Sequence, residues 1–477
     1  MRPAIRCRKS KWRGKGALTA GMDRKAETEV VRVAVATLGC KVNQCESAGI
    51  AEALAARGIT IVPFEETADG YIINTCTVTG RTDSQSRQLI RRAIRKNPAA
   101  AVLVTGCYAQ RAPEEIARIQ GVRFIAGNAE KERIPDILCE MTAGAPRVQV
   151  GDIRDQKGIS RLGATLFPEH TRAFLKIQDG CNAFCSYCIV PHARGASRSL
   201  PMEEVAERIS SISRAGFREI VLTGIHLGAW GRDLQPQTDL LTLIRRIAEG
   251  CAVERLRLSS IEPRELNAEL VALIGASGIL CRHLHIPLQS GDDGILAAMS
   301  RDYDAAFFRS LIRDLLPAVP GIAVGIDLLA GFPGETEEAF ANTLRLVEEL
   351  PVAYLHVFPY SRRPGTPAAV MAGQIPEPVK KQRAERLRAV GAEKRKAFAE
   401  RFIGTPLSVL VEGRTDKKTG FPVGFSDNYI PVAVRGGGAT ANRIVRVMPE
   451  AFRDGRLIAG VIHEGRNNPL NTIGSRS

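Results

Sequence analysis

Three closely spaced cysteines, Cys181, Cys185 and Cys188, constrain this chain more than any other feature. A CxxxCxxC set can ligate three irons of a cubane iron–sulfur cluster, whereas a closed electron-transfer cluster uses four cysteines. The remaining iron is then open to a ligand from solution, and chemistry can take place there. A structural zinc site is the alternative and needs a fourth ligand. His192 is the nearby candidate, but Pro191 before it makes a well-aimed ligand awkward.

A second set of cysteines, Cys40, Cys76 and Cys107, is spread over the first part of the chain. Each one follows a short apolar run that predicts a buried parallel strand: residues 31–36, 70–73 and 101–104. Open α/β sheets bind ligands at the carboxyl ends of their strands, so we expect the three thiols to converge there. Converging thiolates predict a second metal cluster. The alternative is three unrelated buried cysteines, because free cysteine is often buried.

With both cysteine sets in view, the chain resembles the radical S-adenosylmethionine (SAM) methylthiotransferase family. The resemblance extends from about Arg32 to Val461, and four further motifs support it: Leu222–Gly228, Leu258–Pro263, His283–Gly291 and Gly331–Thr336. It implies two 4Fe-4S clusters as cofactors, with SAM on the open iron of the first. Cys181, Cys185 and Cys188 would then be catalytic cluster ligands, and Cys40, Cys76 and Cys107 would ligate the second cluster.

The alternation of predicted elements indicates an α/β multidomain protein. Parallel strands and helical stretches such as residues 44–57 and 85–95 predict an N-terminal α/β domain over residues 30–145. Repeated helix–strand pairs predict a parallel barrel or partial barrel, with its site at the strands' carboxyl ends; the resemblance makes this a radical-SAM partial (β/α)6 barrel over residues 167–400. Short strands between turn residues predict a small β-barrel at residues 401–464, where the family carries an OB-like, tRNA-binding TRAM domain. An accessory barrel without a ligand is the alternative.

Composition agrees with a globular protein that has a polyanionic partner. A length of 477 residues suggests two or three domains, and no run of eighteen apolar residues predicts a membrane span, so we expect a cytoplasmic protein. The net charge of +15 favours nucleic acid, unless much of it is solvated surface. Part of the excess lies in residues 1–29, a basic leader that we expect to be disordered; a targeting-like leader and a start codon placed too early are the alternatives.

The strand-end motifs supply candidate cofactor contacts. The resemblance implies that Gly224, Gly228, Ser259, Ser260 and Gln289 contact SAM. His226, Glu262 and His285 lie where polar groups of a pocket belong, but each could equally be a satisfied histidine or a helix cap. The cysteines outside the two sets are interpreted as packing residues or incidental: Cys7, Cys45, Cys139, Cys251 and Cys281.

Within the family, the run Leu38–Gln44 is similar to the branch that acts on N(6)-L-threonylcarbamoyladenosine at position 37, in the anticodon stem-loop of tRNA. The resemblance therefore implies radical-SAM-dependent methylthiolation of C2 of that base, with an electron donor such as flavodoxin or ferredoxin. The alternatives are the branches acting on isopentenyladenosine in tRNA and on an aspartate of a ribosomal protein. Arg362 and Arg363 are a candidate pair for the acidic threonyl carboxylate, with a phosphate contact or a plain surface loop as the alternatives.

Two readings from other classes stay open at this point. One is an electron-relay protein with two clusters, which the open-iron spacing disfavours. The other is a tRNA-binding protein whose clusters are only structural. Neither would release 5′-deoxyadenosine from SAM when reduced.

Overall fold

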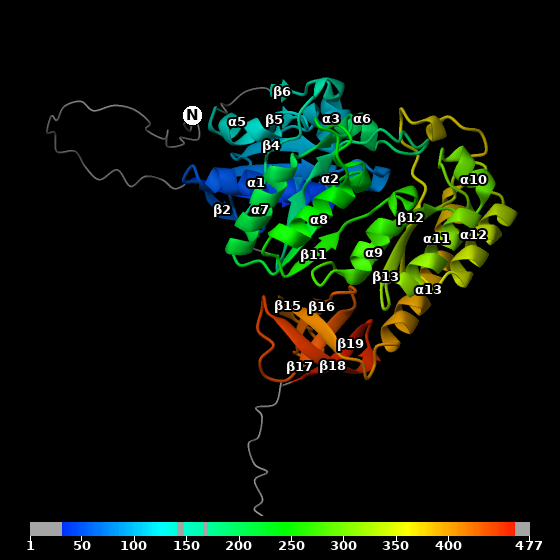
Figure 1. Cartoon of the computed structure of the whole chain (residues 1–477). Helices are drawn as coiled ribbons and strands as arrows, with labels where there is room; N and C mark the ends of the chain where they lie inside the picture. The colour runs from blue at the N-terminus through cyan, green and yellow to red at the C-terminus, as the bar shows by residue number, and fades with distance from the viewer. Residues whose placement is uncertain (1–30, 141–146, 166, 168–169, 463–477) are drawn as a thin grey trace, which may run out of the picture.

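The computed structural model describes residues 31–140, 147–165, 167 and 170–462, so the predicted leader, residues 1–29, lies outside the described residues. Three parts are stacked in Figure 1: an α/β sandwich at the top, a partial barrel in the middle and a small β-barrel at the bottom. The multidomain α/β fold predicted from the sequence is confirmed.

The N-terminal part is built on a sheet of six described strands, all parallel, in the order β2-β1-β3-β4-β5-β6. The strands are β1 (Arg32–Thr37), β2 (Thr60–Val62), β3 (Gly70–Thr75), β4 (Ala101–Gly106), β5 (Val122–Ala126) and β6 (Arg147–Gln149). The helices are α1 (Lys41–Ala55), α2 (Gly80–Lys96), α3 (Cys107–Arg111), α4 (Pro113–Ala117) and α5 (Ile134–Glu140). The strand order reverses between β1 and β3, and such a switch point is where open α/β sheets bind ligands.

Both faces of this sheet are covered, which explains why its strands read as continuous apolar runs. On β3, Tyr71 and Ile73 pack into one hydrophobic cluster, while Ile72 between them packs into another on the opposite face. Every residue of β3 is buried. The strand therefore has no polar face to alternate with its apolar one.

The middle part is a row of parallel strands in two three-stranded sheets, β11-β10-β7 and β12-β13-β14, joined by bridges from Leu256 to Leu280 and from Ser260 to His285. The strands are β7 (Arg172–Lys176), β10 (Glu219–Thr223), β11 (Arg255–Leu258), β12 (His283–Gln289), β13 (Ala323–Ala330) and β14 (Tyr354–Pro359). A short antiparallel pair, β8 (Gln178–Asp179) and β9 (Arg198–Ser199), flanks the first strand. Six parallel strands in chain order fit the predicted partial (β/α)6 barrel.

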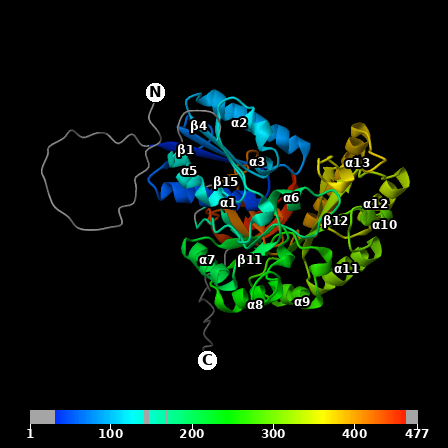
Figure 2. The same cartoon turned by 90° about the horizontal axis from the view of Figure 1, so that it is seen from above.

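Helices follow one another around the outside of this barrel (Figure 2). They are α7 (Met202–Arg214), α8 (Leu240–Gly250), α9 (Ala268–Ala276), α11 (Ala305–Ala318) and α12 (Glu337–Glu349), with the short α6 (Val190–Arg194) and α10 (Asp293–Ala298) in loops. Side-chain caps fix the start of many of them, for example Asp239 before α8 and Thr336 before α12. Short 3-10 helices occupy Lys131–Arg133, Ile153–Asp155, Leu227–Ala229, Pro263–Glu265 and Pro367–Ala369.

The long helix α13 (Glu377–Glu400) leads to the C-terminal part, a closed barrel with the strand order β15-β16-β17-β19-β18. Its strands are β15 (Leu407–Thr415), β16 (Pro422–Ser426), β17 (Pro431–Arg435), β18 (Ile444–Arg453) and β19 (Arg456–Val461). The small β-barrel predicted at this end of the chain is confirmed. No helix in the described part of the chain combines the length and the apolarity needed to cross a bilayer.

Candidate functional site

The cysteine set of the N-terminal part lies at the carboxyl ends of three neighbouring strands. Cys40 follows β1, Cys76 follows β3 and Cys107 follows β4. Gly39, with φ at 102°, brings the first two together, because a Cβ at this position would lie 2.9 Å from the Cys76 sulfur. The set therefore surrounds the point where the strand order reverses.

The three thiols are close enough to affect each other's protonation. Burial, followed by the neighbouring Cys107 and Cys40 thiols, raises the pKa of Cys76 to about 12. Removal of water by the surrounding protein raises the pKa of Cys40 as well, although part of its surface is exposed. Three thiolates can coexist here only with a compensating positive charge, which bound iron supplies.

A buried ion network lies beside this set and joins the N-terminal part to the barrel. Glu46 of α1 pairs with Lys131, with Lys176 at 2.9 Å and with Arg194 at 3.0 Å. Asp179 pairs with the same Lys176 at 3.3 Å and Arg194 at 2.9 Å. None of these side chains is more than 8% exposed. Three buried cations thus share two buried carboxylates.

Arg194 carries the excess positive charge of this network toward the cysteines. Its guanidinium interacts electrostatically with Cys107 and Cys40, and its Nε has no hydrogen-bond partner among the described residues. A buried cation without a full complement of anions is costly. Three thiolates ligating a cluster would balance it, so the donor set and its surroundings fit an iron–sulfur cluster.

The set of Cys181, Cys185 and Cys188 lies in the loop between β8 and α6. Cys181 contacts His226 (Sγ to Nδ1, 3.5 Å), and Cys185 accepts a hydrogen bond from Arg301 (3.2 Å). Burial and the Cys185 and Cys181 thiols raise the pKa of Cys188 to about 12. His226 also meets Glu265 at 2.9 Å, and Arg301 pairs with Glu262, so both contacts are themselves held in place.

Sulfur spacing separates a cluster from a single zinc ion. Among the described residues, neither cysteine set brings its three sulfurs within 4.8 Å of one another. Tetrahedral zinc with 2.3 Å bonds to sulfur needs separations of about 3.8 Å. The ring of His192, the alternative fourth ligand, packs against Phe184 with centroids 5.9 Å apart. The geometry favours cluster ligation over zinc at both sets.

The predicted SAM contacts lie on loops that follow barrel strands. Gly224 comes after β10 and packs on Gln178, and a Cβ at Gly228 would lie 1.9 Å from a Glu265 oxygen. Ser259 follows β11, and its buried hydroxyl has no partner among the described residues. Ser260 bridges to His285, and Gln289 ends β12 with φ at 68°. Their contact with SAM stays a prediction.

The structure assigns Arg363 a role other than the predicted one. It hydrogen bonds Asp83 at 2.6 Å and Thr77 at 2.7 Å, and it is 8% exposed. Arg362 donates its Nε to the Ala369 carbonyl at 2.6 Å. Arg363 therefore ties the barrel to the N-terminal part through its Nη2, close to Cys76, and its burial removes it from the surface open to a substrate.

Sequence reasoning missed several polar groups inside the barrel. His285 and His356 meet the same Asp327 oxygen at 2.8 and 3.6 Å. His285 lies in the motif His283–Gly291, but no spacing rule in the sequence pairs it with Asp327 and His356 on the next two strands. Their proximity follows only from the register of β12, β13 and β14.

The amino ends of the barrel strands meet the C-terminal barrel at a cationic cluster, which we define as Lys41, Arg172 and Arg257. Tyr429 of the C-terminal barrel lies between the two arginines, whose guanidinium carbons are 5.3 and 4.9 Å from the ring centroid. Arg257 also donates hydrogen bonds to the carbonyls of Asp427 and Ser426. The barrel is closed at this end by a residue from the last part of the chain.

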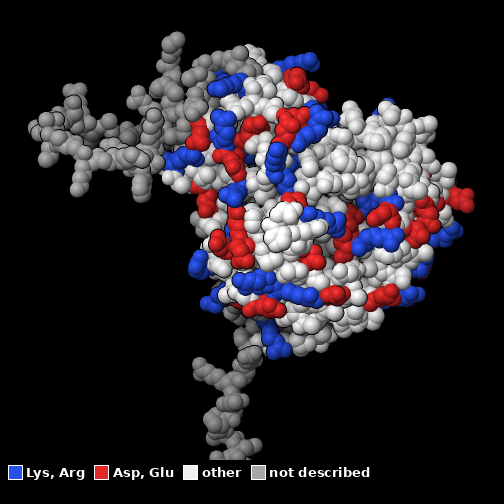
Figure 3. Space-filling view, turned by 45° about the horizontal axis from the view of Figure 1, so that its top comes forward, with Lys and Arg blue, Asp and Glu red and all other residues white. Residues whose placement is uncertain are grey.

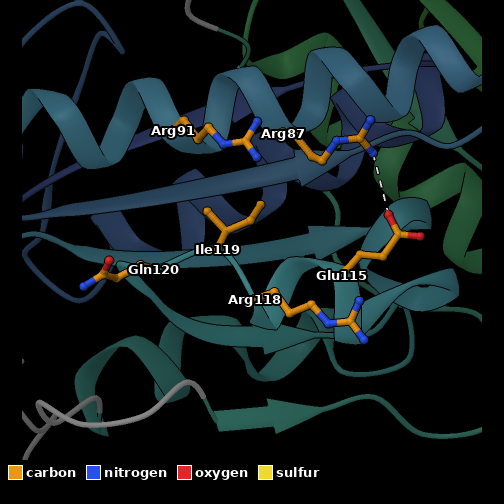
Figure 4. A pocket seen from close by; sticks show the side chains of 6 residues that line it. All are labelled: Arg87, Arg91, Glu115, Arg118, Ile119 and Gln120. Atoms are coloured by element: carbon orange, nitrogen blue, oxygen red, sulfur yellow. Dashed lines mark ion pairs between the residues drawn. The ribbon is translucent and has the colours of Figure 1, made fainter.

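Charge on the surface is distributed differently from charge in the interior. On the face drawn in Figure 3, lysines and arginines are interspersed with acidic residues. A shallow recess of about 420 Å³ on the N-terminal part is more one-sided (Figure 4). It is lined by Arg87, Arg91, Glu115, Arg118, Ile119 and Gln120. Arg87 is held by Tyr108 and Glu115, while Arg91 and Arg118 have no hydrogen-bond or ion-pair partner among the described residues.

Two family models match the chain. Residues 32–127 match the Uncharacterized protein family UPF0004, and residues 175–347 match the Radical SAM superfamily. The chain is also similar to a solved radical S-adenosylmethionine methyltransferase, TsrM from Kitasatospora setae. The TM-score is 0.53 at 17% identity, over 72% of this chain and 77% of that one. A likeness at this identity concerns the fold alone.

Curated relatives are much more similar. The threonylcarbamoyladenosine tRNA methylthiotransferase MtaB of Bacillus subtilis (strain 168) is 42% identical over 421 residues, which is 87% of this chain and 93% of that one. The enzyme of the same name from Aquifex aeolicus (strain VF5) is 37% identical over 88% of this chain and all of its own length. Both alignments include most of the described structure.

Proposed function

Because the chain belongs to the radical-SAM methylthiotransferase family, in its MtaB branch, we propose that it methylthiolates C2 of N(6)-L-threonylcarbamoyladenosine at position 37 of tRNA. The observation that supports this most directly is the similarity to enzymes of that name over nearly their whole length. Isopentenyladenosine and a ribosomal-protein aspartate, the substrates of the other two branches, are not favoured.

We assign the two cysteine sets different roles. Cys181, Cys185 and Cys188 would hold a 4Fe-4S cluster, which when bound would supply the electron for SAM cleavage. We infer that Cys40, Cys76 and Cys107 hold a second cluster, which carries the sulfur to be transferred. What supports a second cluster is the convergence of three thiols next to a buried excess of positive charge.

The surrounding residues position these groups and exclude water. Arg301 and His226 contact the first set and are fixed by Glu262 and Glu265, so we infer that they orient its ligands. Gly224, Gly228, Ser259, Ser260 and Gln289 are our candidates for SAM contacts. The reducing partner expected from the sequence, such as flavodoxin or ferredoxin, and the cytoplasmic location stay predictions.

We infer that tRNA is held by positive charge outside the barrel. The free guanidinium groups of Arg91 and Arg118 are suited to phosphates, because arginine binds them with paired hydrogen bonds. The C-terminal barrel is the candidate TRAM domain.

Mass spectrometry of tRNA nucleosides tests the proposed reaction. A strain without this gene should lose the 2-methylthio form of threonylcarbamoyladenosine and regain it with the wild-type copy. Loss of the isopentenyl form instead, or no change in tRNA, would assign the protein to another branch.

Iron analysis tests the two cluster sites separately. Replacing Cys181, Cys185 and Cys188 by alanine should remove about half of the bound iron, because each site holds four irons. Replacing Cys40, Cys76 and Cys107 should remove the other half. If the second replacement left the iron content unchanged, only one cluster would exist.

A further inference from the structure

Lys41 stands out in the cationic cluster because it has no anionic partner. Arg257 pairs with Glu219 at 2.7 Å and Arg172 with Glu412 at 3.2 Å. Lys41 forms no hydrogen bond or ion pair with any residue that the structure describes. It interacts electrostatically with Tyr429, Arg257, Arg172 and Glu219, so its side chain extends toward the same end of the barrel.

The carboxylates nearby are already shared. Glu219 also pairs with Arg255 at 3.6 Å, and Glu412 also pairs with Arg414 at 2.6 Å. Neither is available to Lys41 alone. The partly enclosed interior therefore holds more positive than negative charge.

Two uncharged neighbours report this positive potential. Burial, reinforced by Arg257, Lys41 and Arg172, holds the pKa of His283 well below its usual value, so the ring stays neutral. Burial alone would raise the pKa of Tyr429, but Arg172, Lys41 and Arg257 lower it overall. An anion entering this region would meet an attractive field from all three cations.

The position of Lys41 in the chain sets where such an anion would lie. Lys41 directly follows Cys40 and begins α1. Consecutive Cα atoms are about 3.8 Å apart. A group held by the Lys41 ammonium therefore lies within about the length of one lysine side chain of Cys40, which belongs to the cysteine set that we assign to the sulfur-carrying cluster.

We propose that Lys41 binds the carboxylate of the substrate's threonylcarbamoyl group, in the positive field of Arg172 and Arg257. This rests on the proposed function. An isopentenyl group carries no charge, so the same contact would select threonylcarbamoyladenosine against isopentenyladenosine. Arg363, one of the two arginines predicted from the sequence for this contact, is buried, and its Nη2 is held by Asp83 and Thr77.

The test is the binding of two synthetic anticodon stem-loops that differ in one charge. One carries threonylcarbamoyladenosine at position 37 and the other carries its methyl ester. Dissociation constants are measured by fluorescence anisotropy without SAM or reductant, for the wild type, Lys41→Met and Lys41→Arg. Lys381→Met, an exposed lysine of α13, is the matched control.

A hydrogen bond to a charged group is worth about 10- to 100-fold in affinity. The wild type should prefer the acid over the ester by that factor, Lys41→Met should lose the preference, and Lys41→Arg and Lys381→Met should keep it. A wild type that binds both RNAs equally, or Lys41→Met with the wild-type preference, would overturn the proposal.

Two further measurements keep the result interpretable. Equal iron content and equal thermal unfolding of the variants exclude a damaged fold. Turnover of the acid RNA by the wild type with SAM and dithionite tests the proposed reaction itself. If the proposed function is wrong, this turnover is absent. If only the carboxylate contact is wrong, turnover is seen but the ratio of the dissociation constants for the acid and the ester does not depend on Lys41.

Discussion

The buried network around Glu46 makes a sharp prediction about how the N-terminal part is attached to the barrel. In Glu46→Gln, Lys131 would lose its carboxylate partner, and Lys176 and Arg194 would keep only Asp179. The wild-type Glu46 side chain is 2% exposed, so water cannot take its place. Removing one partner from a buried ion pair costs about 3–5 kcal/mol. Because three cations share Glu46, we expect Glu46→Gln to weaken the attachment of α1 to the barrel by a free energy in that range.

Cys45 provides a local probe of this attachment. It lies on α1, is 1% exposed and packs into the hydrophobic core of the barrel. Alkylation of its thiol requires α1 to separate from the barrel, and its rate follows the population of that opened state. A loss of 3–5 kcal/mol corresponds to an increase of about two to nearly four orders of magnitude in the alkylation rate.

Peptide mass spectrometry after timed alkylation gives the rate for each cysteine in one experiment. Cys281 is buried between the barrel and the C-terminal part and should keep its wild-type rate, since Glu46 does not contact it. Glu114→Gln, an exposed acid of α4, is the control variant. A Cys45 rate that changes less than fivefold in Glu46→Gln, or an equal acceleration of Cys281, would refute the reasoning.

Three further predictions follow from charge. The ion pairs hold the pKa of Glu46 well below 4.5, so its contribution to stability is complete above pH 4.5 and declines as the pH falls below that value. In urea unfolding, the free energy of unfolding should therefore fall more steeply with decreasing pH in the wild type than in Glu46→Gln. Parallel curves for the two proteins would contradict this. Arg301→Met should lower the reduction potential of the cluster at Cys185 by about 60–120 mV, because a charged hydrogen-bond donor to the sulfur is lost. A redox titration monitored by EPR measures this potential, and an unchanged value would mean that the contact is only structural. Arg91→Ala and Arg118→Ala should each lower the slope of log affinity for tRNA against log salt by about one, with Lys381→Ala as control, and an unchanged slope would exclude the recess as a phosphate site.

Local patterns predicted much of the fold and the placement of the cysteines. The apolar runs before Cys40, Cys76 and Cys107 became β1, β3 and β4, and the rule for strand ends predicted that the thiols converge. Helix α2 was predicted to start at residue 85 but begins at Gly80. Thr79 forms a capping box there, and a polar first turn hides the start from any search for apolar periodicity.

The rest of the site depends on pairs that no local pattern contains. Glu46 and Arg194 are 148 positions apart, and Asp83 and Arg363 are 280 positions apart. Arg363 is a candidate substrate contact in the sequence, as one of two neighbouring arginines in a loop, with a phosphate contact or a plain surface loop as the alternatives. Its partner lies on another domain, and only the tertiary structure reveals it.

The insertion of Tyr429 at the base of the barrel also bears on the order in which the protein is made. Ribosomes release the two cysteine sets and all six barrel strands before the strands of the C-terminal barrel appear. At that stage Arg172 and Arg257 face an open end, and the tyrosine that lies between them has not yet been synthesised. This end of the barrel is therefore closed only after the barrel strands themselves have been made, by a residue of the C-terminal barrel.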